Sequence, residues 1–264
     1  LNLVFFYLQD LDNSSTESMK HTILEGEPGS GKTDCAKIIA KLYAGLGVTK
    51  NDKFMSFSRS DLIGKYLGHT AAKTKECFEK AKGGVMFIDE AYSLGNSEGR
   101  DSFSKEAIDT INLYLTEMKD DIVLIIAGYK KELDESFFRY NPGLYRRFPF
   151  RFSTGKPNPE ELRLIYIKKV LDGGWSITDP IEKNLPIEFF TKNAEYFKYN
   201  GGDMETLFYL TRIVHSRNVF GKKQSLRKKI TKKDLDQSLE LFLSNDEVKN
   251  RKNRMSISAM NMYI

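Results

Sequence analysis

The glycine pattern Gly26–Thr33, of the form G-x-x-x-x-G-K-T, limits the possible folds of this 264-residue chain more than any other feature. A short apolar segment at His21–Glu25 precedes it and the helical pattern Thr33–Tyr43 follows it. In this context, glycines let backbone N–H groups wrap phosphates at a helix N-terminus. We predict that Lys32 neutralises the β- and γ-phosphates of ATP and that the Thr33 hydroxyl is a Mg²⁺ ligand. The predicted ATP-binding residues are the whole pattern, Gly26, Glu27, Pro28, Gly29, Ser30, Gly31, Lys32 and Thr33.

A second apolar run, Val85–Asp89, ends in two carboxylates, those of Asp89 and Glu90. A parallel strand places such side chains at the carboxyl edge of the sheet, beside a phosphate loop. We predict that Asp89 binds ATP-bound Mg²⁺ through its water shell, and that Glu90 polarises the water that attacks the γ-phosphate. The alternative is a polar strand end without a function, but the neighbouring phosphate loop favours the catalytic interpretation.

Short apolar runs alternate with helical patterns in the first part of the chain. The predicted strands are His21–Glu25, Phe54–Phe57, Val85–Asp89, Ile122–Ala127 and Pro149–Phe152, and the predicted helices between them are Thr33–Tyr43, Thr70–Lys82 and Phe103–Met118. Such alternation predicts an α/β fold with a doubly wound, parallel five-stranded sheet.

The helix breakers Gly155-Lys156-Pro157-Asn158-Pro159 predict a domain boundary. Four helical patterns follow, at Pro159–Val170, Pro186–Tyr199, Asp203–Asn218 and Thr231–Phe242. We therefore predict a partial N-terminal helix and linker (1–18), a nucleotide-binding core (19–155), a small all-helical lid (156–244) and a loose polar tail (245–264). Because the chain starts without Met inside an apparent helix, we expect that its N-terminus is trimmed.

The composition bounds the partners and the compartment. With 41 Lys and Arg against 36 Asp and Glu, the net charge is +5, and part of the excess lies within Gly221–Asp234. That run indicates a solvated face, which we favour, or a site for nucleic acid or an acidic protein. Cys35 and Cys77 have no disulfide or metal spacing, and no apolar run is long enough for a membrane span. We predict a soluble, cytoplasmic protein.

The two motifs and the span between them resemble the AAA+ ATPases, and within them the branch that contains the red-type Rubisco activase CbbX and stage V sporulation protein K. The similarity covers residues 19–154 and runs through Ala36-Lys37-Ile38-Ile39-Ala40, Ser58-Arg59-Ser60-Asp61-Leu62, Gly68-His69-Thr70-Ala71, Phe87-Ile88-Asp89-Glu90-Ala91-Tyr92-Ser93-Leu94, Glu106-Ala107-Ile108-Asp109-Thr110, Ala127-Gly128-Tyr129 and Asn141-Pro142-Gly143-Leu144. In the lid, Gly201-Gly202-Asp203-Met204-Glu205 is similar to versions from large DNA viruses.

The resemblance implies an ATPase that forms a ring, in this case a hexamer, and threads or remodels a protein substrate. It implies that Tyr66 and Leu67 form the central pore loop that grips the substrate; the alternative for Tyr66 is a plain packing role. It also implies that Arg147 enters the neighbouring subunit's site and offsets charge on the transferred phosphate, with Arg146 as the alternative residue.

Two positions depart from the wider family pattern. Tyr129 stands where many members carry a polar sensor at the end of the fourth strand, and we place it at the nucleotide. Met204 stands where the lid is expected to carry an arginine, with Arg212 as a candidate replacement. The alternatives to remodelling are a DNA-handling ATPase of the loader or initiator type, favoured by the Lys-rich run, and a nucleotide-gated scaffold with little turnover.

Overall fold

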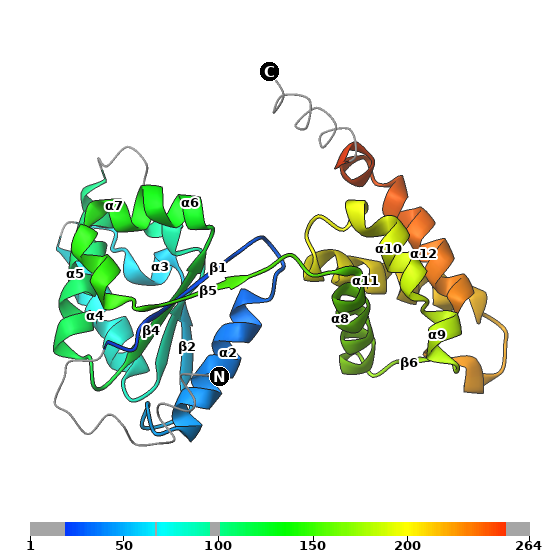
Figure 1. Cartoon of the computed structure of the whole chain (residues 1–264), viewed down its shortest axis with the longest axis horizontal. Coiled ribbons are helices and arrows are strands. Elements are labelled where there is room, and N and C mark those ends of the chain that lie inside the picture. Colours follow the sequence, from blue (N-terminus) through cyan, green and yellow to red (C-terminus); the bar gives the residue numbers. More distant parts are fainter. Residues whose placement is uncertain (1–18, 67, 96–100, 252–264) are drawn as a thin grey trace. The chain divides into compact units, whose positions relative to one another are not determined.

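The computed structural model of the chain describes residues 19–66, 68–95 and 101–251 (Figure 1). The described residues divide into two compact units: residues 19–27 and 31–155 form one, and residues 28–30 and 156–251 form the other. The predicted N-terminal helix and linker (1–18) lies outside the described residues, as do residues 252–264 of the predicted tail.

The first unit is built on a parallel sheet with the strand order β2-β3-β4-β1-β5. Its strands are β1 (Thr22–Gly26), β2 (Phe54–Phe57), β3 (Val85–Ile88), β4 (Val123–Gly128) and β5 (Phe150–Thr154). β1 lies between β4 and β5, because Thr22 is in register with Ile125 on one side and Phe150 on the other. The predicted five-stranded, doubly wound sheet is confirmed.

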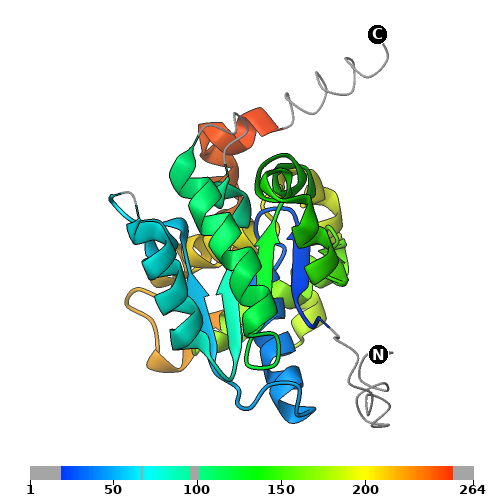
Figure 2. The same cartoon turned by 90° about the vertical axis from the view of Figure 1, so that its left-hand side faces the viewer.

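Helices cover both faces of this sheet, as its alternating side chains require. One face buries Met86, Ile88 and Leu124 against α4 (His69–Ala81) and α5 (Ser102–Glu117), which lie in front of the strands in Figure 2. The other buries Phe87 and Ile125 against α2 (Lys32–Gly45). The remaining elements are α3 (Arg59–Leu62), η1 (Ala91–Leu94), α6 (Lys130–Glu132), the π-helical turn η2 (Leu133–Phe137), α7 (Phe138–Tyr140) and η3 (Pro142–Arg147).

The second unit is a helical bundle with an aromatic core that includes Phe190 and Phe197. Its elements are α8 (Pro159–Asp172), β6 (Ser176–Ile177), α9 (Ile181–Asn184), α10 (Ile187–Asn193), η4 (Ala194–Tyr196), α11 (Gly201–Asn218), η5 (Gln224–Leu226), β7 (Lys229–Ile230) and α12 (Lys232–Ser244). The short parallel pair of β6 and β7 is an addition to the predicted helices. No helix in the described ranges combines the length and the apolar character needed to cross a membrane, and the predicted cytoplasmic location stays a prediction.

The start of the predicted loose tail is ordered, which corrects the prediction. Residues 246–251 are helical, and Val248 and Arg251 are buried against the second unit. The Arg251 guanidinium donates to the Asp203 carboxylate at 2.9 Å and to the Glu247 carboxylate at 2.7 Å. A buried arginine is tolerated here because it is paired with carboxylates.

A buried histidine makes the stability of the first unit depend on pH. His21 is fully buried; its Nδ1 accepts from the Leu124 N–H at 3.0 Å, so this nitrogen carries no proton in the fold. Burial lowers the pKa of His21 to about 4. The unfolded chain gains a proton near pH 6.5 and the folded chain only near pH 4, so stability is lost as the pH falls between these values.

We expect the free energy of unfolding to drop by about 3 kcal/mol over this window because of His21 alone. Denaturant unfolding followed by circular dichroism at a series of pH values measures the loss. In His21→Asn, whose amide oxygen can still accept from the Leu124 N–H, the loss should shrink by that amount. The exposed His69 serves as the control, because His69→Asn should keep the wild-type slope. An unchanged slope in His21→Asn would contradict the assignment.

Candidate nucleotide site

The glycine pattern forms the connection between β1 and α2 at the carboxyl edge of the sheet. Gly31 has a φ of 84° and precedes the first residue of α2, and Gly29 has a φ of 69°. Positive φ is costly for residues with a Cβ atom, so the loop needs glycine at both positions. The path leaves the first N–H groups of α2 without helical partners, which is the arrangement that binds a phosphate group.

Lys32 is folded back onto this loop. Its Nζ donates to the Gly26 carbonyl at 2.8 Å and to the Glu27 carbonyl at 3.0 Å, and it lies 5.4 Å from the centre of the Tyr129 ring. Burial lowers the pKa of Lys32, and the negative charge of Asp89 opposes the shift. A half-buried ammonium group held by neutral carbonyls has donors to offer to an anion, which fits the triphosphate of ATP.

Thr33 and Asp89 meet, although the sequence separates them widely. The Thr33 Oγ1 donates to the Asp89 Oδ2 at 3.1 Å, which brings the start of α2 to the end of β3. A hydroxyl and a carboxylate at this separation are the hard oxygen donors that Mg²⁺ takes, directly or through its waters. The two predicted metal-binding residues are therefore neighbours in the structure, and their donor atoms fit the ion.

Glu90 has an unusual backbone conformation. Its φ of 49° and ψ of 44° lie in the left-handed region, and its N–H donates to the Asp89 Oδ1 at 2.9 Å. Such a conformation costs a non-glycine residue roughly 1–3 kcal/mol and is concentrated at functional sites. The Asp89 carboxylate contacts the Thr33 hydroxyl and the Glu90 carboxylate contacts Tyr92, so that one can serve the metal and the other the attacking water.

A pair of stacked tyrosines borders the Glu90 side chain. The rings of Tyr92 and Tyr129 lie 5.4 Å apart and nearly parallel. Burial raises the pKa of Tyr92, and so does a hydrogen bond with the Glu90 carboxylate. A Cβ atom at Gly128 would lie 2.9 Å from the Tyr92 ring, so glycine is required for this approach. The predicted Tyr129 is thus joined by Tyr92, which sequence reasoning left out of the site.

Arg146 and Arg147, the two candidates for the arginine that enters the neighbouring subunit's site, differ in their surroundings. Arg147 donates to the Thr116 hydroxyl from Nε at 3.1 Å and from Nη2 at 3.0 Å, and to the Gly143 carbonyl from Nη1 at 3.0 Å. The Arg146 side chain is exposed. Neither guanidinium has a carboxylate partner among the described residues.

The remaining predicted residues differ in their exposure and their local contacts. The Tyr66 side chain is 66% exposed, with its ring edge-on to His69 at 5.5 Å, and Leu67 lies outside the described residues. In the second unit Met204 is fully buried, so it presents nothing to a phosphate. The Arg212 guanidinium is exposed and lies over the Phe208 ring at 5.1 Å.

Comparison with known proteins decides the family. The family model of the "ATPase family associated with various cellular activities (AAA)" matches residues 22–152. The chloroplastic ribulose bisphosphate carboxylase/oxygenase activase of Cyanidioschyzon merolae is 33% identical over 86% of this chain and 76% of its own length. The chain belongs to the AAA family of ATPases. The AAA domain of FIGL-1, solved in complex with ADP, has the same fold, with a TM-score of 0.62, 21% identity and coverage of 90% of this chain and 77% of that one.

Two other relatives of this AAA chain confirm the predicted branch. A cfxQ-like protein of Acanthamoeba polyphaga mimivirus is 41% identical over 94% of this chain, and stage V sporulation protein K of Bacillus subtilis is 44% identical over 56% of it. This AAA chain spans 61% of the mimivirus protein and 45% of the Bacillus protein. The activity of the whole protein is therefore a matter for proposal.

Proposed function

We propose that the chain binds ATP with Mg²⁺ at Gly26–Thr33 and hydrolyses it. The observation that carries the proposal is the 3.1 Å contact of the Thr33 hydroxyl with the Asp89 carboxylate, beside the Lys32 ammonium group. Lys32 would exchange its loop carbonyls for phosphate oxygens, and Thr33 and Asp89 would hold the metal. When bound, Mg²⁺ neutralises charge on the phosphates. Glu90 accepts a proton from the attacking water, and its hydrogen bond with Tyr92 sets the direction of its carboxylate.

Calorimetric titration with MgATP tests the binding step directly. We expect saturable uptake by the wild-type chain and its loss in Lys32→Ala, because the charge that meets the phosphates is removed. Uptake that is absent in the wild type, or unaffected in the variant, would contradict the proposal. A phosphate-release assay on the same samples then reports whether the bound nucleotide turns over.

The proposal extends to a hexameric ring that remodels or threads a protein substrate. Two features support it: the arginines at the end of η3 lack a carboxylate partner in the described chain, and Tyr66 is a large, exposed aromatic residue. The nucleotide of a neighbouring subunit is a suitable anion for the arginines to bind. A substrate chain is a suitable contact for the exposed Tyr66 ring. Light scattering with and without ATP measures the assembly.

The pore-loop role makes Tyr66 dispensable for basal hydrolysis and necessary for work on a substrate. We expect Tyr66→Ala to keep the basal rate of ATP hydrolysis but to lose its stimulation by an unstructured protein such as reduced casein. Tyr66→Phe should keep the stimulation, because the aromatic grip is retained. If Tyr66→Ala is stimulated like the wild type, Tyr66 has no part in gripping a substrate.

A nucleotide-gated scaffold is the second candidate, favoured by one observation. Met204, at the position where the lid is expected to carry an arginine, is buried in the core of the second unit. This candidate predicts that hydrolysis without that charge is too slow to drive remodelling. The phosphate-release assay separates the candidates, since a scaffold binds ATP but releases no phosphate over many minutes.

A further inference from the structure

A segment of the second unit, Gly221–Lys233, carries a concentrated positive charge and is called the basic segment below. It contains seven cationic side chains and no Asp or Glu: Lys222, Lys223, Arg227, Lys228, Lys229, Lys232 and Lys233. All seven residues are exposed. Their charged groups make no ion pair or hydrogen bond with any part of the chain that the structure describes. The charge of the basic segment therefore has no internal counter-ion there.

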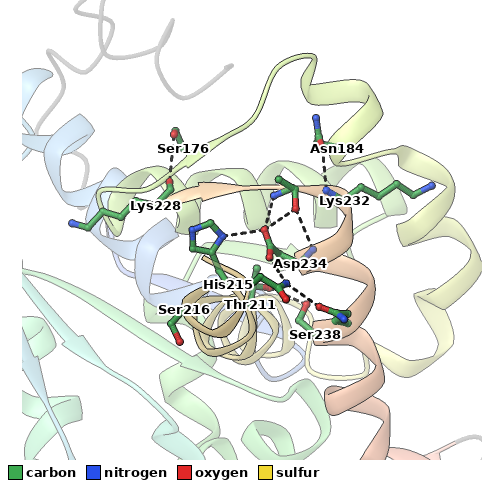
Figure 3. A network of polar contacts seen from close by, with 12 residues as sticks. Ser176, Asn184, Thr211, His215, Ser216, Lys228, Lys232, Asp234 and Ser238 are labelled. Atoms are coloured by element: carbon green, nitrogen blue, oxygen red, sulfur yellow. Dashed lines mark hydrogen bonds and ion pairs between the residues drawn. The ribbon is translucent and has the colours of Figure 1, made fainter. Parts of the chain in front are cut away.

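The basic segment is held in a defined shape by the backbone. β7, inside the segment, pairs with β6: the Ser176 N–H donates to the Lys228 carbonyl at 2.9 Å, and the Thr178 N–H donates to the Ile230 carbonyl at 2.8 Å. The Ser176 hydroxyl also donates to the Lys228 carbonyl (Figure 3). Lys228 has a φ of 60°, which turns the chain just before β7. Lys228 and Lys229 are thus presented from a fixed turn and strand, and Lys232 and Lys233 from the first turn of α12.

The carboxylate of Asp234 directly follows the basic segment but does not neutralise it. Asp234 is buried and accepts from the Thr231 hydroxyl at 2.8 Å and from the Asn218 amide at 2.8 Å (Figure 3). The His215 ring lies 3.0 Å from the same carboxylate. These contacts use Asp234 to anchor the start of α12 to α11, so the lysine charges stay available to a partner.

An exposed aromatic residue directly precedes the basic segment. Phe220 is 89% exposed, and Leu226 within the segment is exposed as well. A phenyl ring in water next to unpaired cations is the combination that binds single-stranded nucleic acid, where phosphates meet the charges and a base stacks on the ring. An acidic protein surface would use the charges but not the ring.

We propose that the basic segment is a contact surface for single-stranded nucleic acid, in which the free cations bind backbone phosphates and Phe220 stacks on a base. This contact uses none of the residues of the proposed nucleotide site and does not depend on the proposed hydrolysis. It also does not require recognition of a base sequence, since every base has a face that can stack.

Fluorescence anisotropy of a labelled oligodeoxythymidine, titrated with the whole chain at several salt concentrations, tests the contact. We expect binding that weakens with salt, and a Lys222→Gln/Lys223→Gln variant that binds on the order of tenfold more weakly at ~0.1 M salt. Its plot of log affinity against log salt should be shallower by about 1.4, because each phosphate contact to a single strand contributes about 0.7. Phe220→Leu should weaken binding several-fold without changing this slope.

The matched control removes the same charge elsewhere. Lys37 and Lys41 are exposed on α2, so Lys37→Gln/Lys41→Gln should keep the wild-type slope. Equal losses in both double variants would reduce the effect to net charge and overturn the proposal. The proposal is also overturned if the wild type does not bind the oligonucleotide at low salt, or if it binds a duplex more tightly. It is likewise overturned if polyglutamate competes equally well and Phe220→Leu has no effect on binding. ATP hydrolysis in Lys222→Gln/Lys223→Gln should stay unchanged, which keeps the two proposals distinguishable.

Discussion

Replacing Glu90 with Gln is expected to lower the rate of ATP hydrolysis by about 10²–10⁴-fold while ATP binding is retained. The amide keeps the size of the side chain and can still contact Tyr92, but it cannot accept a proton from water. The residues that contact the phosphates and the metal in our proposal, Lys32, Thr33 and Asp89, are untouched. Phosphate release measures the rate, and calorimetry with MgATP measures the binding.

A charge-matched variant controls for the loss of one carboxylate. Glu79 is exposed on α4, so Glu79→Gln should hydrolyse ATP at the wild-type rate. If Glu90→Gln also hydrolyses at the wild-type rate, Glu90 does not activate the water. If both the wild type and Glu90→Gln bind ATP without releasing phosphate, the chain is a scaffold.

The sheet was predictable because its strands are buried on both faces and read as short apolar runs between helical patterns. The segment from Lys130 to Tyr140 was not, because a π-helical turn interrupts it and removes the regular helical period. The helix at residues 246–251 was missed for another reason. Its Arg251 is buried because it pairs with Glu247, one turn earlier, and with Asp203, far away in the sequence, and a polar sequence does not reveal the distant partner.

The candidate site likewise contains residues that local sequence patterns predict and a residue that they do not. Lys32, Thr33, Asp89 and Glu90 follow from local patterns, since a phosphate loop and a strand end need particular residues at fixed spacing. Tyr92 does not, because its place beside Glu90 depends on stacking with Tyr129 from another strand end. The available signals were an aromatic residue two positions after Glu90 and the small Gly128 that makes room for it.

Replacing Arg147 with Ala is expected to reduce hydrolysis by about 10³–10⁵-fold in assembled rings, if it acts on a neighbour's nucleotide. All of its observed partners, the Thr116 hydroxyl and the Gly143 carbonyl, are uncharged. An arginine held by neutral acceptors has no ion pair to break, and hydrogen bonds to a charged phosphate are roughly twice as strong. Arg147 is thus held in place and free to exchange its partners. Phosphate release over a range of protein concentration measures the effect.

Two variants separate this role from simpler ones. Thr116→Val removes two of the hydrogen bonds of Arg147 with little change in volume. If Arg147 only fixes η3 against α5, Thr116→Val should reproduce much of the loss; if it acts on phosphate, Thr116→Val should be mild. Arg146→Ala tests the alternative residue for this role. If only Arg146→Ala loses ATP hydrolysis, Arg146 and not Arg147 acts on the neighbour's nucleotide.

Mixing two inactive chains decides whether the site is shared between subunits. Glu90→Gln lacks the group that activates water but keeps Arg147, and Arg147→Ala has the opposite defect. In a mixed ring, an Arg147→Ala subunit next to a Glu90→Gln subunit regains a complete site, because the neighbour supplies the guanidinium. Activity should therefore appear on mixing, although each chain alone has almost none. If the mixture shows only the average of the two residual activities, Arg147 acts within its own subunit. A direct path from Arg147 to Glu90 within one chain would then have to be found.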